Sequence, residues 1–316
     1  MRHPRRIVAL LCVLLCAALA SGCGVGPGAT TEGAGVELLV TRDFGRQVVL
    51  DRRFDELPAS ETVMRLLQRS AAVETRYGGG FVQCVDGRCG GGSDGRRDWF
   101  YFVNGVEAPA GAAATKVRAG DRIWWDLRDW RAAQRAPAVV GSFPEPFLRG
   151  PHAERLAVRV ECADVKAPAC RRVRAELVAA GVVAGTTALR SQVTAGETLR
   201  VLVGPWDALR EDEALRLLEE GPQASGVFAE PRADGTAIAL LDSRGRTVRT
   251  LGAGSGLVAA ARLGQDPPVW AVSGVGAAGV EAAARAFDAR TLRRRFAVAV
   301  DASGPLALPL VPAKDG

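Results

Sequence analysis

Cysteines are the residues whose type and spacing most clearly indicate chemistry in this chain. Cys84 and Cys89 enclose four residues, and Cys162 and Cys170 enclose seven. In an exported chain, two such close pairs favour two disulfides, each stabilising the fold by roughly 2 kcal/mol. A four-cysteine zinc site and free thiols are the alternatives, although these spacings fit zinc ribbons poorly. The other cysteines are Cys12, Cys16 and Cys23.

The N-terminus has the pattern of a secretory signal. Three arginines precede an apolar run over residues 7–20, which is too short to span a bilayer comfortably. The run ends in Ala20-Ser21-Gly22-Cys23, which resembles the bacterial lipobox. The resemblance implies a signal peptide over residues 1–22 and a diacylglycerol on Cys23, which would attach the protein to the extracytoplasmic face of the plasma membrane. An ordinary secretory peptide and an uncleaved anchor are the alternatives.

Few residues offer catalytic or cofactor-binding chemistry. The stretch Gly274–Gly279 matches GxGxxG between a predicted strand and helix, and Asp301 ends the next strand. Only 15 residues follow Asp301, so we interpret the stretch as a tight strand-to-helix turn rather than a nucleotide site. Ser255 is flanked by glycines, but the only histidines are His3 and His152. We therefore expect no enzyme, no catalytic residue, no cofactor and no metal site.

The charge balance argues against a nucleic-acid partner. The chain has 41 lysines and arginines against 35 acidic residues, a formal charge of +6. Loss of the three N-terminal arginines with the signal peptide leaves 38 against 35, which is +3. No basic run is interleaved with aromatic residues, and we expect no nucleic-acid binding. We attribute the large excess of arginine over lysine first to codon bias, which favours a high-GC Gram-positive source.

Residues 36–130 have the element order of a β-grasp domain. Short runs rich in β-branched or aromatic residues, some with alternating apolar and polar positions, predict strands. One segment in which apolar residues recur with a period of 3.6 residues predicts a helix. The predicted elements are strands 36–40 and 46–50, a helix capped by Ser60, and strands 99–103 and 122–126.

Four motifs in this region resemble the transcobalamin-like C-terminal domain, a module of many Gram-positive surface proteins. They are YGGGF at 77–81, DG at 86–87, DWFYFVNG at 98–105 and GDRIW at 120–124. The resemblance implies a β-grasp fold and a cobamide-like ligand. Cobalamin carriers also hold the corrin against a large helical barrel, which this chain lacks. Within the matching motifs, the expected ligand-binding residues are Tyr77, Gly79, Phe81, Trp99, Tyr101 and Asn104.

The aromatic strand at 99–103 must present two different faces. Trp99 and Tyr101 point one way, and Phe100 and Phe102 point the other way. One set is expected to be core. The other set either covers a flat apolar ligand or forms a half-exposed sheet face.

The rest of the chain is predicted to form a second domain. A glycine-rich flexible tether at 23–35 precedes the first domain, and a proline-rich, ordered linker at 131–155 follows it. Residues 156–316 alternate strands and helices, including a helix at 207–220 and a short helix at 257–263, which predicts an α/β domain with a mixed sheet. The fold class expected for the whole chain is therefore α+β.

These patterns favour a membrane-anchored extracytoplasmic lipoprotein that binds a small ligand. The resemblance implies a cobamide-like molecule passed to an uptake transporter. The alternative is an envelope adaptor that binds another protein and has no small-molecule ligand.

Overall fold

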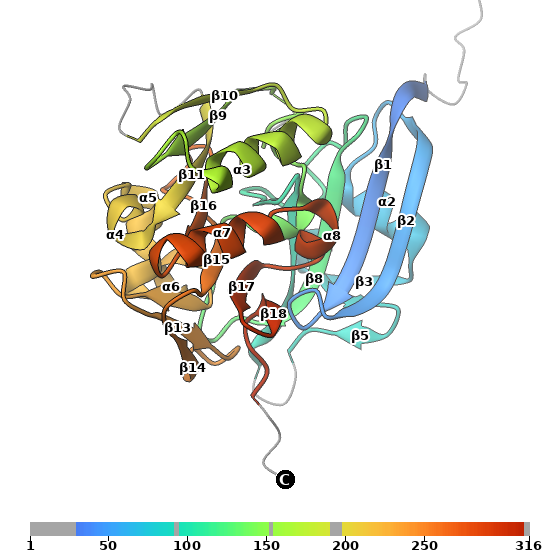
Figure 1. Cartoon of the computed structure of the whole chain (residues 1–316). Coiled ribbons are helices and arrows are strands. Elements are labelled where there is room, and N and C mark those ends of the chain that lie inside the picture. The colour runs from blue at the N-terminus through green and yellow to red at the C-terminus, as the bar shows by residue number, and fades with distance from the viewer. Residues whose placement is uncertain (1–29, 92–94, 152–153, 190–197, 313–316) are drawn as a thin grey trace, which may run out of the picture.

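The structure is a computed structural model of the chain, and it describes residues 30–91, 95–151, 154–189 and 198–312. The predicted signal peptide, Cys23 and most of the predicted tether lie outside the described residues. Strands gather in several sheets with a few helices packed on them (Figure 1), which confirms the α+β class. None of the helices among the described residues has the length and hydrophobicity needed to cross a bilayer.

The N-terminal part contains a five-stranded sheet in the order β2-β1-β8-β6-β7. β1 pairs antiparallel with β2 and parallel with β8, the arrangement expected for a β-grasp sheet. β1 already begins at Thr30, so the last residues of the predicted tether belong to a strand. The strands are β1 (Thr30–Arg42), β2 (Gln47–Pro58), β6 (Arg97–Val103), β7 (Val106–Glu107) and β8 (Arg122–Asp129).

One helix and one small hairpin sheet cover the inner face of this sheet. α2 (Val63–Ser70) begins one turn after Ser60, because Thr62, not Ser60, accepts the hydrogen bond from the Arg65 amide. Its apolar residues are buried against the sheet. The hairpin sheet consists of β3 (Val73–Arg76), the short 3-10 turn η1 (Tyr77–Gly79), β4 (Phe81–Val85) and β5 (Arg88–Cys89).

The C-terminal part is built on a seven-stranded mixed sheet, as predicted. Its order is β10-β9-β11-β16-β15-β17-β18, with the first four strands parallel and the last three alternating in direction. The strands are β9 (Ala157–Cys162), β10 (Ala184–Ala188), β11 (Thr198–Pro205), β15 (Gly256–Ala261), β16 (Val269–Gly274), β17 (Ala297–Asp301) and β18 (Gly304–Leu308).

The helix predicted at 257–263 is wrong, because this segment is the strand β15. Every residue of β15 is buried, since β16 and β17 flank it and both sheet faces are covered. A strand buried on both faces shows a continuous apolar run without the alternation that identifies most strands. That run was mistaken for a short buried helix.

Helices cover both faces of the seven-stranded sheet. α3 (Pro168–Ala179) and α7 (Gly276–Ala286) pack side by side on one face (Figure 1). The helix predicted at 207–220 is broken into three pieces, because the Asp212 carboxylate caps a new start by accepting the amides of Ala214 and Leu215. The other elements are α4 (Trp206–Leu209), α5 (Glu213–Arg216), η4 (Leu217–Glu220), α6 (Pro222–Ser225), α8 (Ala289–Leu292), and the sheet β12 (Ala229–Pro231), β13 (Ile238–Leu241) and β14 (Thr247–Leu251).

A shared hydrophobic core joins the two parts. Phe296, just before β17, makes edge-to-face contacts with Phe44, Phe102 and Trp124 of the N-terminal part, with ring centroids 5.2, 5.5 and 5.3 Å apart. All four rings are buried in one cluster. The two predicted domains therefore pack through a common core.

The predicted linker at 131–155 is folded onto the C-terminal part. Its short 3-10 turn η2 (Val140–Ser142) precedes Phe143, and Phe147 follows a few residues later. Both rings are buried against Trp270 and Phe287. The described residues of the segment thus contribute two rings to the core of the C-terminal part.

Candidate functional site

The predicted ligand residues of the glycine-rich turn lie at the tip of the hairpin sheet. Tyr77 is 85% exposed and has a left-handed backbone with φ of 53°, and Gly79 next to it faces open space. Phe81 is half-buried, and its ring centroid lies 6.2 Å from that of Tyr77. Every aromatic residue of the chain lies in the described ranges, and Tyr77 is the only exposed one. A ligand role for these three residues stays a prediction.

The other predicted ligand residues lie inside the fold. Trp99 and Tyr101 are buried against α2, where the Trp99 indole donates to the Arg88 carbonyl at 3.0 Å. The Tyr101 hydroxyl donates to the Ala110 carbonyl at 2.5 Å. Asn104 is fully buried, and its amide donates to Asp121 at 2.9 Å. Their ligand role stays a prediction, and in this structure their side chains have structural partners instead.

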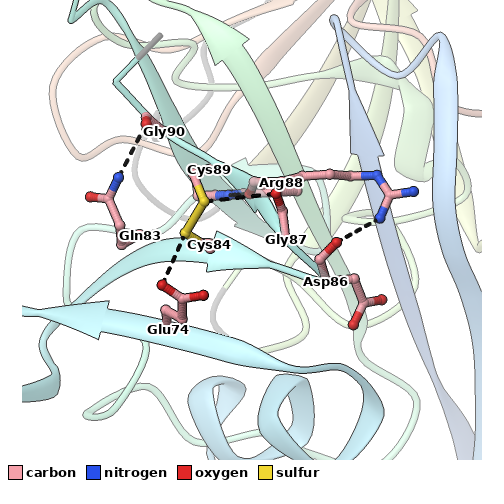
Figure 2. Close-up of a disulfide and its surroundings, with 9 residues drawn as sticks. Glu74, Gln83, Cys84, Asp86, Gly87, Arg88, Cys89 and Gly90 are labelled. Atoms are coloured by element: carbon pink, nitrogen blue, oxygen red, sulfur yellow. Dashed lines mark hydrogen bonds between the residues drawn. A yellow bond between two sulfur atoms is a disulfide. The ribbon is translucent and has the colours of Figure 1, made fainter.

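Both predicted disulfides are present. Cys84–Cys89 joins β4 to β5, and Cys162–Cys170 joins β9 to α3. Figure 2 shows the first bond with its surroundings, where the Gln83 amide donates to the Gly90 carbonyl at 3.1 Å. The disulfide therefore ties β5 to β4, the second strand of the hairpin that carries Tyr77.

The outer face of the five-stranded sheet is covered over part of its area. Phe102 and Trp124 point to this face and are buried in the shared core. Phe100, on the same face, lies under the Arg128 guanidinium, whose carbon is 3.9 Å from the ring centroid. The aromatic face that could have covered a flat ligand is thus occupied by the C-terminal part and by Arg128.

The uncovered part of this outer face is the floor of a cleft of about 900 Å³. Arg122, Glu37 and Arg53 are neighbours across β8, β1 and β2. The Glu37 carboxylate lies 3.1 Å from Arg122 Nε and 3.6 Å from Arg53 Nη1. In the next row, Asp51 lies opposite Leu39. The floor therefore has a row of charged side chains beside a row that includes the apolar residues Leu39 and Trp124.

The wall of the cleft is the loop of three consecutive arginines, Arg293–Arg295, between α8 and β17. Two glycines allow this loop to approach the sheet. A side chain on Gly45 would overlap the Arg294 carbonyl, and one on Gly141 would lie 2.7 Å from the Arg295 amide nitrogen. The Arg294 amide donates to the Gly141 carbonyl at 3.2 Å. The loop is therefore held between two turns of the N-terminal part and the linker.

The turn that contains Gly45 is fixed by a buried carboxylate. Asp126 of β8 accepts hydrogen bonds from the amides of Phe44 and Gly45, at 2.9 and 3.0 Å. It also accepts one from the Thr41 hydroxyl at 2.6 Å. Burial raises the pKa of the Asp126 carboxyl, although these hydrogen bonds oppose the shift. Asp126 thus positions the turn against the arginine loop.

Positive charge dominates the cleft. Its lining includes eight arginines and two carboxylates, Glu37 and Asp51. Within the described part of the chain, the side chains of Arg290 and Arg294 have no ion pair and no hydrogen bond. Arg295 has a buried Nη1 without a hydrogen-bond partner, and burial lowers its pKa despite the nearby charge of Asp288. The eight arginines are Arg46, Arg52, Arg53, Arg122, Arg290, Arg293, Arg294 and Arg295.

Guanidinium groups that lack partners are suited to bind anions. Each presents a planar fork of donors that matches a carboxylate or a phosphate. The volume is at the upper end of small-molecule sites, which occupy about 300–1,000 Å³. Within the described ranges, no three His, Cys, Asp or Glu side chains come together as metal ligands would. The arrangement can hold a small ligand that carries several negative charges.

The sequence contained one local signal for this cleft that was missed. The run Arg293-Arg294-Arg295 stands directly before Phe296, but arginine abundance was attributed to codon bias. The remaining cleft residues come from strands and turns far apart in the chain, so no local spacing could group them.

The GxGxxG stretch forms the predicted strand-to-helix turn between β16 and α7. A side chain on Gly274 or Gly279 would overlap neighbouring backbone, so these glycines allow close packing of strand and helix. Asp301 ends β17 as predicted, but its carboxylate pairs with Arg249 at 2.7 Å and accepts from Ser303. His152 lies outside the described residues. That the chain binds no nucleotide and has no catalytic activity stays a prediction.

Comparisons with known proteins find one family model that matches within the N-terminal part. A family model described as Domain of unknown function (DUF4430) matches residues 60–129. A crystal structure of haptocorrin in complex with Cbi is similar over 35% of this chain and 27% of haptocorrin, with 18% identity and a TM-score of 0.27. The chain thus spans about a quarter of the length of haptocorrin.

A second solved structure, from Ruminococcus gnavus ATCC 29149, is described as a candidate metal binding protein. It is similar over 30% of this chain and 97% of its own, with 20% identity and a TM-score of 0.24. No curated protein matches the chain.

Proposed function

We propose that the protein binds a small ligand with two or more phosphate or carboxylate groups in the arginine cleft. The observation that carries the proposal is that the cleft is lined by Arg290 and Arg294, whose side chains have no ion pair or hydrogen bond among the described residues, and by Arg295, whose buried Nη1 has no hydrogen-bond partner there. Eight arginines against two carboxylates leave an excess of positive charge around the cleft, and a bound anion would offset that charge. The folded chain therefore holds a positive site ready for a negative ligand.

The expected setting is the outer face of the cell membrane. The lipobox-like residues before Cys23 favour a lipid anchor, and two disulfides suit an oxidising compartment. A transporter that takes up the ligand would be the partner, and no catalytic step is proposed.

A cobamide-like molecule is the particular ligand that the transcobalamin resemblance implies. Such a ligand would present its single phosphodiester to the arginines, and this one negative charge would offset little of the excess of eight arginines over two carboxylates. The cleft therefore favours a more highly charged ligand over a cobamide.

The second candidate function is an envelope adaptor without a small-molecule ligand. Tyr77 favours it, because this exposed aromatic side chain lies at the tip of the β3–β4 hairpin. Exposed aromatic residues commonly anchor protein–protein contacts.

Calorimetric titration of the purified protein at low salt tests the proposal. The probes are inorganic phosphate, pyrophosphate, citrate, cobalamin and cobinamide, with a neutral disaccharide as the control. We expect saturable binding of pyrophosphate that is tighter than that of phosphate and weakens as salt rises. Absence of saturable binding of every anionic probe at millimolar concentration would contradict the proposal. Tight binding of cobalamin alone would favour the cobamide reading instead.

A further inference from the structure

One ion pair crosses the arginine cleft from floor to wall. The Asp51 carboxylate on β2 lies 2.7 Å from the Arg293 guanidinium at the end of α8. The two residues are 242 positions apart in the chain, so the pair joins the N-terminal and C-terminal parts. Both side chains are substantially exposed, at 42% for Asp51 and 61% for Arg293.

Asp51 differs from the other carboxylate of the cleft. Glu37 lies on the floor and pairs with floor arginines only. Among the wall arginines within the described part of the chain, Arg293 is the one whose side chain pairs with an acid. The Asp51 carboxylate therefore stands where an anionic group of a ligand would contact the wall.

We infer that Asp51 is an intramolecular competitor for the anion site, and that a ligand displaces it from Arg293. The inference rests on the proposed function, because it concerns the affinity of the same cleft. An exposed pair of this kind is weak, so its exchange for a ligand group is easy. While Asp51 remains in the cleft, its charge also repels the bound anion.

The size of the effect follows from the charge that Asp51 contributes. A negative charge about 4 Å from a ligand charge changes binding about fivefold, even in water. Removal of the Asp51 charge also leaves Arg293 free to bind the ligand. We therefore expect Asp51→Asn to bind pyrophosphate at least about fivefold more tightly than the unchanged protein.

The test measures pyrophosphate binding by calorimetry at fixed ionic strength for the unchanged protein and three variants. Asp51→Asn removes the competing charge from the cleft. Glu56→Gln is the matched control, because it removes the same charge from an exposed site on β2 outside the cleft lining. The double variant Asp51→Asn/Arg293→Gln tests whether the gain in pyrophosphate affinity depends on the Arg293 guanidinium. Thermal melts check that each variant is folded.

Three results have different meanings. Tighter binding by Asp51→Asn, with little change in Glu56→Gln and a smaller gain without Arg293, would support the inference. Equal or weaker binding by Asp51→Asn would overturn it, while binding by the unchanged protein would leave the proposed function standing. If neither the unchanged protein nor Asp51→Asn binds pyrophosphate, both the inference and the proposed function fail.

Discussion

Substitution of Arg294 by glycine should raise stability and weaken anion binding at the same time. Arg294 has a φ of 60°, in the left-handed region, where a residue with a side chain is strained by about 1–2 kcal/mol. Glycine relieves this strain but loses about 0.5–1 kcal/mol through the greater freedom of the unfolded chain. The expected net change is a gain of about 0.5–1 kcal/mol in the free energy of unfolding.

The effect on binding has the opposite sign, because glycine removes an unpaired guanidinium from the cleft wall. One unit charge about 4 Å from one ligand charge contributes about 1 kcal/mol in water. Pyrophosphate carries several charges, so its affinity should fall at least about fivefold. A residue that costs stability and serves binding is typical of functional sites.

Denaturant unfolding and calorimetric titration with pyrophosphate measure the two effects on the same preparation. Tyr77→Gly is the matched control, because Tyr77 has a similar φ of 53° and lies outside the cleft lining. It should gain stability without a change in pyrophosphate affinity. Arg294→Gly would refute the reasoning if it were less stable than the unchanged protein, or if it bound pyrophosphate equally well.

The other predictions concern the parts that hold the cleft in place. Phe296→Ala should lower the free energy of unfolding by about 3–5 kcal/mol and destabilise both parts of the chain, because the Phe296 ring fills the shared core. Denaturant unfolding followed by probes in each part measures this loss. A loss below about 1 kcal/mol would contradict the prediction. Gly45→Ala should destabilise the fold and weaken pyrophosphate binding, because the new methyl group would overlap the Arg294 carbonyl. Unchanged pyrophosphate affinity, measured by calorimetry, would show that the turn containing Gly45 does not position the loop Arg293–Arg295. Burial raises the pKa of the Asp126 carboxyl in the folded protein. The contribution of this group to stability is therefore full below its unfolded pKa and declines as pH rises through its folded pKa. The denaturant midpoint of unfolding should fall more steeply from pH 4 to 8 in the unchanged protein than in Asp126→Asn.

The elements with strong local patterns could be predicted from the sequence. The aromatic run at 99–103 forms β6, and the close cysteine pairs form disulfides. These features depend on residues near one another in the chain. The run 257–263 was assigned wrongly, because burial on both faces removes the alternation by which a strand is recognised.

The candidate site depended on contacts that the sequence does not display. The sequence could not show that both faces of β6 contribute to a core, because Phe102 packs on Phe296, almost two hundred residues away in the chain, while Trp99 packs in the other cluster. Likewise, Arg53, Arg122 and Arg294 share a cleft only because the sheet and the loop pack together. In a chain with many arginines, such a cluster has no distinctive composition.

The binding of pyrophosphate to a variant that lacks the Arg290 and Arg294 guanidinium groups tests the central claim most directly. Arg290→Ser/Arg294→Ser removes two guanidinium groups from the cleft. Arg172→Ser/Arg232→Ser removes two exposed arginines that lie outside it, and so matches the change in net charge. We predict at least about a tenfold loss of affinity in the first variant and less than about a twofold change in the second. Equal affinities in the two variants would contradict the assignment of the cleft as the ligand site.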